Sequence, residues 1–431
     1  MTVANMLGTV HPDGRRPRLL RLTPFFHHGN VDAWPARYDP IGGQQTQCLA
    51  QSLWLADRGI DQIVLTLGFP GVPSDYSLRP GLQIRRACFP MPEWRSRTTG
   101  LVGLTANWYW ATRASCRRIY GAGGWRPDLV HVHGDGQVEA LRLVPWVRRL
   151  FGCPVVLTIH CSRLANYKPM SWIDGLRHSR VQAAERRAVA ATDAVICLNL
   201  DTQRTVETEV PTAANTHVLP DIIDIDAFRR AAASDAARSA QVQFARPDGR
   251  KLVTFVGRIA HEKGWSDLVR LMSDVRTRDC SALFVGDGPQ RGALEAAIDA
   301  AGLRQRCQVT GFVSRDAVAG LLAASHVVVI PSVHEEFGGV AIEAMVLGVP
   351  VVGYAVGGLR STIGALDSRL LVAPGDQRAL ADVVAAVLAG APWVRDAALR
   401  SEALARSLCD ADFLMPRLLA IYAGLSFPYR F

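Results

Sequence analysis

Short apolar runs alternate with amphipathic segments along most of the chain. The apolar runs of the first half, which have the length of buried strands, lie at residues 18–23, 61–67, 128–133, 154–159, 193–198 and 216–219. Segments with a helical spacing of apolar residues lie between them, at residues 44–57, 101–120, 138–150 and 183–191. Because strand and helix alternate, this half is predicted to form a parallel sheet covered by helices on both faces.

The second half shows the same alternation more clearly. Strands are expected at residues 251–257, 282–286, 308–310, 326–330, 350–354 and 370–372. Ser314 and Asp376 each precede a helical segment and are predicted to cap its first turn. A chain of 431 residues is long enough for two domains with separate cores, so one sheet is expected in each.

Two segments of the first half depart from this regular alternation. Residues 68–100 are rich in Pro, Gly and Arg and are expected to loop over the crevice at the strand ends. The helix expected at 101–120 carries Trp108, Trp110 and several arginines. It is interpreted as a helix with one buried face, and an interfacial or acceptor-facing helix is the alternative.

Composition narrows the class of protein. Hydrophobic residues make up 49% of the chain, which is typical of a globular domain. The net charge of +9 is uneven, because residues 1–222 carry 25 basic and 17 acidic residues whereas the remainder carries 23 and 22. This basic half could contact phosphates or, peripherally, an anionic membrane. No basic run with interleaved aromatic residues is present, so nucleic acid is not an expected partner.

The cysteines and the N-terminus indicate a cytoplasmic protein. The nine cysteines are widely spaced without a C-x-x-C motif, which predicts buried thiols and no zinc site. Residues 1–17 are polar and basic, so we expect them to be disordered and not to form a secretory signal. No uncharged apolar stretch suggests a membrane span.

The candidate chemistry centres on residues 331–344, which read Pro-Ser-Val-His-Glu-Glu-Phe-Gly-Gly-Val-Ala-Ile-Glu-Ala. An apolar strand precedes them and a helix follows, so Glu335 lies on a strand-to-helix loop where ligands bind in open α/β sheets. Glu343 is the only ionisable residue between Gly338 and Tyr354. A buried carboxylate needs partners, which can be the hydroxyl groups of a ligand or the backbone.

Five motifs stand in order around this stretch. They are G-R-x-x-x-E-K-G at 257–264, G-D-G-P at 286–289, G-F-V at 311–313, P-S-x-x-E-x-F-G at 331–338 and P-G-D at 374–376. Together they resemble the retaining nucleotide-sugar glycosyltransferases of family 4. The resemblance covers residues 18–425. It implies the α/β fold called GT-B, in which two Rossmann-like domains with parallel sheets face each other across a cleft.

The resemblance also implies the domain bounds. Residues 18–222 would form an acceptor-binding domain, and residues 223–412 a nucleotide-sugar-binding domain. Residues 413–431 would form a helix that crosses back to the N-terminal domain. At the linker, Pro220-Asp221-Ile222-Ile223-Asp224 departs from the family's P-N-G-V-D, because Asp221 and Ile222 replace Asn and Gly.

Breaking a sugar–nucleotide bond requires stabilisation of a diphosphate leaving group. Arg258 offers a bidentate fork and Lys263 a compact positive charge, so no metal ion or other cofactor is expected. Family membership implies that Glu343 binds the ribose, and that Glu335 and the amides of Phe337, Gly338 and Gly339 bind the donor sugar. It gives Phe312 and Val313 to the base.

The resemblance implies further roles for the N-terminal half. Gly42 and Gly43 precede a helix and would face the phosphates, although two glycines by themselves are equally consistent with a plain turn. His160 would face the transferred sugar or the acceptor. His131 and His133 share one face of a strand and would line the cleft. A metal pair is the alternative interpretation of these two histidines.

Retention of the anomeric configuration is implied as well. No catalytic base is required if the leaving phosphate accepts the acceptor's proton, and Glu335 as a covalent nucleophile is the weaker alternative.

The acceptor is the least constrained substrate. The opening at residues 24–28 and the loop lengths most resemble enzymes that glycosylate 2-deoxystreptamine in aminoglycoside antibiotic assembly, with UDP-N-acetylglucosamine or UDP-glucose as the donor. Carboxylates suited to such a polycationic acceptor are Asp32, Asp39, Glu93, Asp135, Glu139 and Asp174, and His133 is a further candidate. The basic N-terminal half favours instead a phosphorylated or lipid-linked acceptor. A nucleotide-sugar epimerase or hydrolase is the second alternative.

Overall fold

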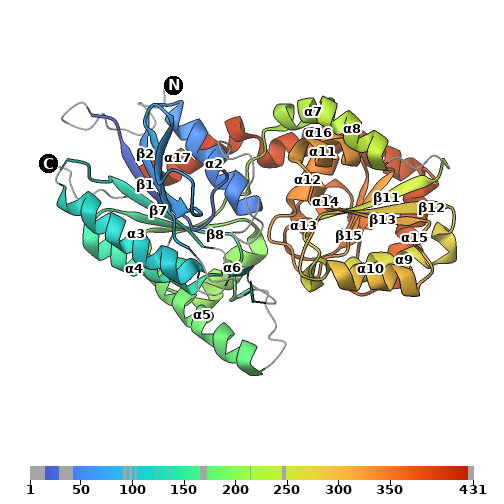
Figure 1. Ribbon diagram of the computed structural model, residues 1–431, viewed down its shortest axis with the longest axis horizontal. Coiled ribbons are helices and arrows are strands. Elements are labelled where there is room, and N and C mark those ends of the chain that lie inside the picture. Colours follow the sequence, from blue (N-terminus) through green and yellow to red (C-terminus); the bar gives the residue numbers. More distant parts are fainter. Residues whose placement is uncertain are drawn as a thin grey trace. The chain divides into compact units, whose positions relative to one another are not determined.

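The computed structural model describes residues 15–28, 42–90, 95–96, 100–101, 104–122, 124–134, 136–165, 172–213, 215–244 and 249–425. The chain divides into two compact units (Figure 1). Unit 1 comprises Met1–Ile222 together with Ala411–Phe431, and unit 2 comprises Ile223–Asp410. Each unit is an α/β domain with its own sheet.

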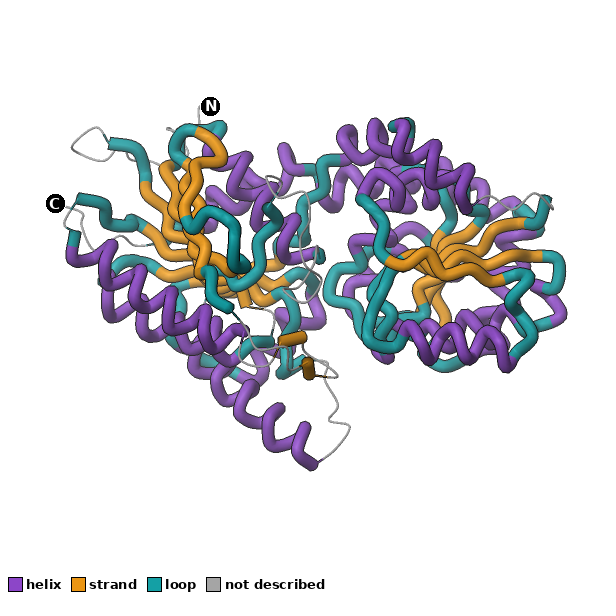
Figure 2. The backbone as a smooth tube through the Cα atoms, in the orientation of Figure 1, coloured by secondary structure: helices purple, strands orange, loops and turns teal. Residues whose placement is uncertain are grey.

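Unit 1 is built on an eight-stranded sheet with helices on both faces (Figure 2). In spatial order the strands are β10 (Thr216–Val218), β9 (Ala194–Cys197), β8 (Val155–Ile159), β7 (Leu129–Gly134), β1 (Arg18–Leu22), β2 (Asp61–Leu67), β4 (Leu82–Ala87) and β3 (Asp75–Arg79). Its helices are α2 (Gly43–Ala56), α3 (Leu104–Gly121), α4 (Val138–Phe151), α5 (Trp172–Ala190), α6 (Leu200–Glu209) and α17 (Ala411–Ala423). A separate pair of short strands is formed by β5 (Arg95–Ser96) and β6 (Gly100–Leu101).

The two faces of this sheet differ in polarity because side chains alternate along each strand. On β1, Leu20 and Leu22 belong to the apolar core that includes residues of α3 and α4. Arg21 lies between them and points to the opposite face, where it contacts α2. On β7, His131 and His133 share that second face with Arg21. A polar cluster is thus built into the middle of unit 1.

The prediction of a loop over residues 68–100 was wrong for part of the segment. Residues 75–87 form β3 and β4, and β4 pairs in parallel with β2 at the edge of the main sheet. Leu82 and Ile84 are fully buried while Gln83 between them is exposed. This alternation is the ordinary pattern of a strand with one face covered, but the flanking Arg and Gly residues obscured it.

Helix α3 has the one buried face that its sequence predicts. Trp108, Thr112, Cys116 and Ile119 are buried at helical spacing. Trp110 is 63% exposed, and the Arg113 guanidinium lies near its ring. The alternative interpretation of α3, as an interfacial or acceptor-facing helix, stays a prediction.

Helices α5 and α17 of unit 1 were both expected, and both begin earlier in the chain than predicted. Helix α5 begins at Trp172, well before the expected start at residue 183. Helix α17 belongs to unit 1 although it follows unit 2 in the chain. Its residues Leu414, Met415, Leu418 and Tyr422 are buried, and it packs beside α2.

Unit 2 contains a six-stranded parallel sheet. In spatial order its strands are β13 (Cys307–Gly311), β12 (Cys280–Val285), β11 (Lys251–Val256), β14 (Val327–Ile330), β15 (Val351–Tyr354) and β16 (Leu371–Val372). Its helices are α7 (Ile225–Ala232), α8 (Asp235–Phe244), α9 (Trp265–Met272), α10 (Arg291–Ala300), α11 (Arg315–Ala323), α12 (Gly339–Val346), α13 (Gly357–Ser361), α14 (Ile363–Leu366), α15 (Gln377–Leu388) and α16 (Pro392–Cys409). Ser314 and Asp376 cap α11 and α15 with their side chains, as predicted.

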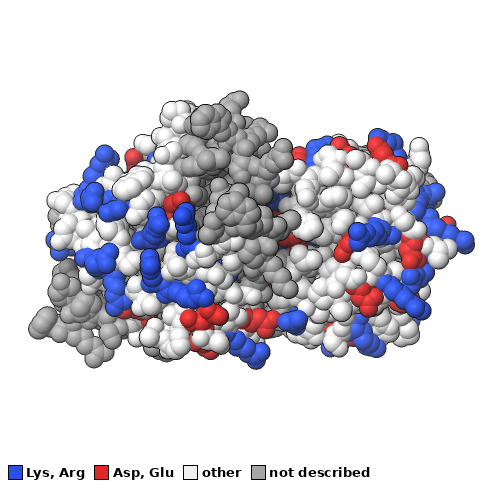
Figure 3. Space-filling model, turned by 90° about the horizontal axis from the view of Figure 1, so that it is seen from below, with Lys and Arg blue, Asp and Glu red and all other residues white. Residues whose placement is uncertain are grey.

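Charge is distributed differently over the two units. Figure 3 shows Lys and Arg side chains gathered on the visible face of unit 1, whereas the same view of unit 2 mixes both signs. This agrees with the uneven charge of the sequence. None of the helices in the described ranges is long and apolar enough to cross a membrane.

Candidate active site

The donor-side residues predicted in unit 2 meet at the carboxyl ends of its central strands. Lys263 comes from a short 3₁₀ helix, η2 (His261–Lys263), which follows β11. Its Nζ lies 2.7 Å from Oε1 of Glu335, on the loop that follows β14. The Ser332 hydroxyl donates to the same carboxylate oxygen at 2.9 Å. The structure therefore joins Lys263 and Glu335, 72 residues apart in the chain, in one ion pair.

A glycine permits this approach of two loops. Gly264 has φ +69°, and a Cβ at this position would lie 1.9 Å from the carbonyl oxygen of Pro331. Next to it, the Val333 amide donates to the Glu262 carbonyl oxygen at 3.0 Å. No side chain fits at Gly264 without moving one of the loops. The glycine of the E-K-G motif is thus needed to place the lysine.

The Glu335 loop is held on its other side by the start of α13. The Gly358 amide donates to the Glu335 carbonyl oxygen at 2.9 Å. A Cβ on Gly357, which has φ +38°, would lie 2.0 Å from that same oxygen. Glycines from the segment after β15 therefore fix the loop between two rigid neighbours.

Helix α12 begins directly after this loop and presents its N-terminus to it. Gly338 is the N-cap residue, and no side chain caps the helix. The first turn contains no acidic residue. Its amides, beginning with Gly339, can therefore donate to an oxygen-rich ligand, and the helix dipole favours negative charge there.

Glu343 lies on α12 and is mostly but not completely removed from solvent. Its side chain is 19% exposed, and Arg315 Nη2 is 3.9 Å from its Oε1. Burial raises the pKa of Glu343 to about 7, and the Arg315 charge only partly offsets this. The sequence analysis correctly identified a carboxylate that needs partners, and Arg315 was not foreseen as one of them.

The other residues predicted on the donor side lie at the same edge of the sheet. Arg258 follows β11, is exposed, and forms no side-chain hydrogen bond or ion pair with a residue in the described ranges. Phe312 follows β13 and is 59% exposed, while Val313 beside it is half-buried. Because β13, β12, β11 and β14 are neighbours, these loops open on one side of the sheet.

In unit 1, Asp221 lies near both Gly43 and His160. In the sequence analysis this residue was noted only as a departure from the family's linker motif. Asp221 Oδ1 lies 3.9 Å from Nδ1 of His160. Its Oδ2 lies 3.9 Å from the position of a Cβ on Gly43. Gly42 is the N-cap of α2, and no side chain caps that helix. A carboxylate thus stands at the helix N-terminus that was predicted to face phosphates.

The two histidines of β7 have different surroundings. His133 is fully buried, and its Nδ1 lies 3.0 Å from Nε2 of His160. It can therefore act on a ligand only through His160. His131 has one ring nitrogen 2.7 Å from the Tyr422 hydroxyl and the other 2.7 Å from the Thr158 hydroxyl. With both nitrogens engaged, a metal shared by His131 and His133 does not fit.

Some candidate acceptor contacts are not placed. Asp32, Asp39, Glu93 and Asp135 lie outside the described residues. Glu139 is half-buried in the first turn of α4. Sequence reasoning missed Arg21 and Cys48, which contact the histidine cluster from β1 and α2. The available signal was Arg21 between two leucines of an apolar run.

Comparison with known proteins identifies the family. Residues 42–221 match the family described as glycosyl transferase 4-like domain, and residues 238–402 match glycosyl transferases group 1. A 2-deoxystreptamine N-acetyl-D-glucosaminyltransferase of Streptomyces fradiae is 50% identical over 84% of this chain and 86% of that protein. The chain is a group 1 glycosyltransferase. A second relative of this glycosyltransferase, a 2-deoxystreptamine glucosyltransferase of Streptomyces kanamyceticus, is 41% identical over 82% of this chain and 94% of that protein.

Solved structures confirm the fold of the group 1 glycosyltransferase. Sucrose-phosphate synthase of Thermosynechococcus elongatus aligns with a TM-score of 0.77 and 23% identity, over 94% of this chain and 98% of that one. The HepE protein of Anabaena, solved in complex with UDP-glucose, aligns with a TM-score of 0.68 and 18% identity over 94% and 98% of the chains. The expected GT-B class of two α/β domains with parallel sheets is therefore confirmed.

Proposed function

We propose that this glycosyltransferase moves a hexose or N-acetylhexosamine from a UDP-sugar to 2-deoxystreptamine, with retention of the anomeric configuration. The observation that carries the proposal is the agreement between the two relatives at 50% and 41% identity. Their names share the acceptor and differ in the sugar. The acceptor is therefore proposed more narrowly than the donor sugar, which is UDP-N-acetylglucosamine or UDP-glucose.

The geometry of unit 2 supports a nucleoside diphosphate sugar as the donor. Arg258 is an exposed guanidinium without a competing partner among the described side chains, which suits a bidentate contact with phosphate. Lys263, on the segment that follows the same strand, supplies a second cation, and a sugar hydroxyl could replace its ammonium as the partner of Glu335. The amides at the start of α12 add donors, and Glu343 is assigned to the ribose.

These groups account for leaving-group stabilisation without a resident metal or cofactor, which we propose is not needed. Two cations and a helix N-terminus can balance the charge that develops on the diphosphate. In unit 1, Gly42 and Gly43 at the start of α2 are proposed to contact phosphate oxygens of the donor. We assign no base to the protein, because the departing phosphate oxygen can accept the proton of the attacking hydroxyl on the same face of the sugar.

Product analysis tests the proposal directly. Purified protein is incubated with 2-deoxystreptamine and each UDP-sugar, and products are followed by mass spectrometry. We expect a gain of one hexose or one N-acetylhexosamine, with an α-linkage by NMR. Release of UDP at a rate unaffected by the acceptor would instead indicate a hydrolase, and no product with either donor would refute the proposal.

A variant of Glu343 tests donor binding independently of the acceptor. Glu343→Ala should abolish the protection that UDP gives against thermal unfolding, because the ribose loses its carboxylate partner. Glu295→Ala, which removes an exposed carboxylate of α10, is the matched control and should keep the protection. Unchanged protection in Glu343→Ala would show that the ribose assignment is wrong.

A further inference from the structure

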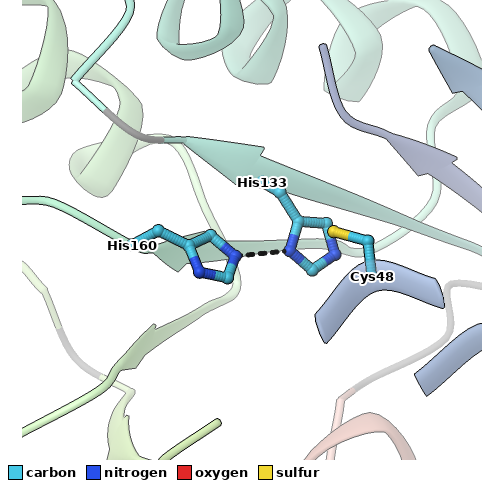
Figure 4. A group of neighbouring side chains, drawn as sticks. All are labelled: Cys48, His133 and His160. Carbon is cyan, nitrogen blue, oxygen red and sulfur yellow. Dashed lines mark hydrogen bonds between the residues drawn. The ribbon is translucent and has the colours of Figure 1, made fainter. Parts of the chain in front are cut away.

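A row of polar side chains runs through the core of unit 1 and ends at His160. Figure 4 shows His133 and His160 side by side, with Cys48 of α2 against the first ring. Nη1 of Arg21, on β1, contacts Nε2 of His133. All four side chains are buried. Such a cluster is costly unless each polar atom has a defined partner, so the direction of each hydrogen bond matters.

The first member of the row can only donate hydrogen bonds. The Arg21 guanidinium is always protonated and has no acceptor atom. Its Nη1 lies 2.9 Å from Oε1 of Gln51 and 2.5 Å from Nε2 of His133. Arg21 forms no ion pair with a carboxylate in the described part of the chain. Nε2 of His133 must therefore carry a lone pair and accept from Arg21.

The proton of His133 is then fixed on its other nitrogen. Burial, with smaller contributions from His131 and Arg21, lowers the pKa of His133 well below its usual value, so the ring is neutral. A neutral imidazole carries one N–H, and here it is Nδ1–H. That nitrogen lies 3.0 Å from Nε2 of His160 and donates to it.

The same argument fixes the position of the proton on His160. Its Nε2 accepts from His133, and burial, followed by the charge of Arg21, lowers its pKa to about 3. The single proton of this neutral ring is on Nδ1, the nitrogen that faces Asp221 and the start of α2. The hydrogen bonds of the row thus run from Arg21 through His133 to His160.

We propose that Arg21 is a positioning residue that sets the tautomers of His133 and His160, so that His160 presents a fixed N–H donor to the substrates. This rests on the proposed function only for the identity of those substrates. His160 then donates to an oxygen of the sugar, the acceptor or Asp221, and it does not remove a proton from the acceptor. The arrangement is consistent with a reaction in which the leaving phosphate is the base.

A bound metal is the competing explanation of the cluster. Ligand atoms of Cys48, His133 and His160 all lie within 4.8 Å of one another. Arg21, however, already occupies Nε2 of His133 and would place a positive charge against the ion. Burial also raises the pKa of Cys48 to about 12, which keeps it a thiol that faces the Thr23 hydroxyl. The geometry favours the arginine.

The first test reads the two tautomers directly in the wild-type protein. Long-range ¹H–¹⁵N spectra of protein labelled at histidine distinguish Nδ1–H, Nε2–H and doubly protonated rings. We expect both His133 and His160 as Nδ1–H at pH 7, the form less populated in free histidine. His133→Gln and His160→Gln assign the signals. Either ring observed as Nε2–H or as imidazolium would overturn the proposal, whatever the substrate is.

The second test links the tautomers to turnover. Arg21→Met should lower kcat about 10- to 100-fold, by analogy with the loss seen when a partner that orients a metal-bound imidazole is removed. KM should change little. Arg21→Lys, which keeps a charged donor, should recover part of the loss. Gln62→Met removes an equally buried polar side chain of β2 outside the row and is the control for general packing damage.

The pH profile separates positioning from a structural role. Without the Arg21 charge, the pKa values of His133 and His160 rise, and the titratable groups that still face the row among the described residues include Cys48, His131, Asp221 and Tyr422. Arg21→Met should therefore lose activity towards acid pH at a higher pH than the wild type, whereas Gln62→Met should not. Equal kcat in Arg21→Met and Gln62→Met, with unshifted profiles, would contradict the proposal.

Titration with cobalt tests whether the cluster of Cys48, His133 and His160 binds a metal ion. A thiolate-to-cobalt absorption band in the wild type that is lost in Cys48→Ser would replace the arginine explanation with a metal site. Absence of the band, with the Nδ1–H tautomers intact, supports the proposal.

Discussion

The side chains proposed to act in this protein divide into those that a motif reveals and those that only the fold reveals. Arg258, Lys263, Glu335 and Glu343 stand in a recognisable order, because their loops must follow particular strands. Arg21 carries no such marker. Its partner His133 is 112 residues away, and only the parallel pairing of β1 with β7 puts both side chains on one face. Contacts of this kind cannot be read from local pattern.

The raised pKa of Glu343 predicts how the free energy of unfolding changes with pH. The folded protein holds this proton up to about pH 7, whereas the unfolded chain releases it near pH 4.5. The unfolded state therefore binds fewer protons between these values, and this carboxyl makes the fold less stable as pH rises through that window. Glu343→Gln should be more stable than the wild type at pH 8, by up to about 3 kcal/mol, and equal to it at pH 4.

Urea unfolding at several pH values measures this difference. Glu295→Gln, at an exposed site of α10, serves as the control and should show no such trend between pH 4 and 8. A constant difference between Glu343→Gln and the wild type across the range would mean that the carboxyl is ionised in the folded protein at neutral pH.

At the level of elements, the strands were predictable where both of their faces are covered. β2 was placed at its exact bounds, and the strands of unit 2 within two residues, because continuous apolar runs bounded by Gly or Pro have few alternatives. β4 was missed since only alternate residues are apolar and two arginines interrupt them. The first half of α5 was missed because its residues show no amphipathic spacing.

The approach of the Lys263 and Glu335 loops can be tested at one position. Gly264→Ala should destabilise unit 2 by several kcal/mol, because its Cβ meets the Pro331 carbonyl oxygen in addition to the strain of a positive φ. Gly302→Ala is a matched control, since its φ of +66° is similar and no atom lies within 4 Å of its Cβ. Its cost should be about 1 kcal/mol.

Chemical denaturation of both variants gives the comparison. The excess loss in Gly264→Ala measures the close approach alone, and UDP affinity should fall with it because Lys263 moves. Equal stability of the two variants would mean that the loops separate without cost, contrary to the contacts described.

At the level of the whole chain, unit 1 is built from two segments that are separated in the sequence by all of unit 2. Unit 1 includes a helix that follows all of unit 2 in the chain, so its core is closed only after unit 2 has been made. The crossing helix was expected from the family resemblance, and no local signal in residues 411–423 identifies the surface that it covers. Only the buried residues of α17 in the fold do so.

Helix α17 should therefore stabilise unit 1 and not unit 2. Leu418→Ala removes a fully buried side chain and should cost about 2–5 kcal/mol of unit 1 stability. Phe413→Ala, at a residue of the same helix that is 57% exposed, should have a much smaller effect. Hydrogen exchange of peptides from β1, β7 and α2, compared with peptides from β11 and β14, measures the two units separately. Equal acceleration in both units would contradict this assignment.

The ion pair between Lys263 and Glu335 has a consequence for the end of the catalytic cycle. If Lys263 binds the diphosphate and Glu335 the sugar, as proposed, the ammonium keeps a carboxylate partner within reach when the spent nucleotide departs. Departure of the sugar would free that carboxylate first, so transfer itself would prepare the replacement partner. Turnover should on this account favour discharge of UDP over discharge of the intact donor.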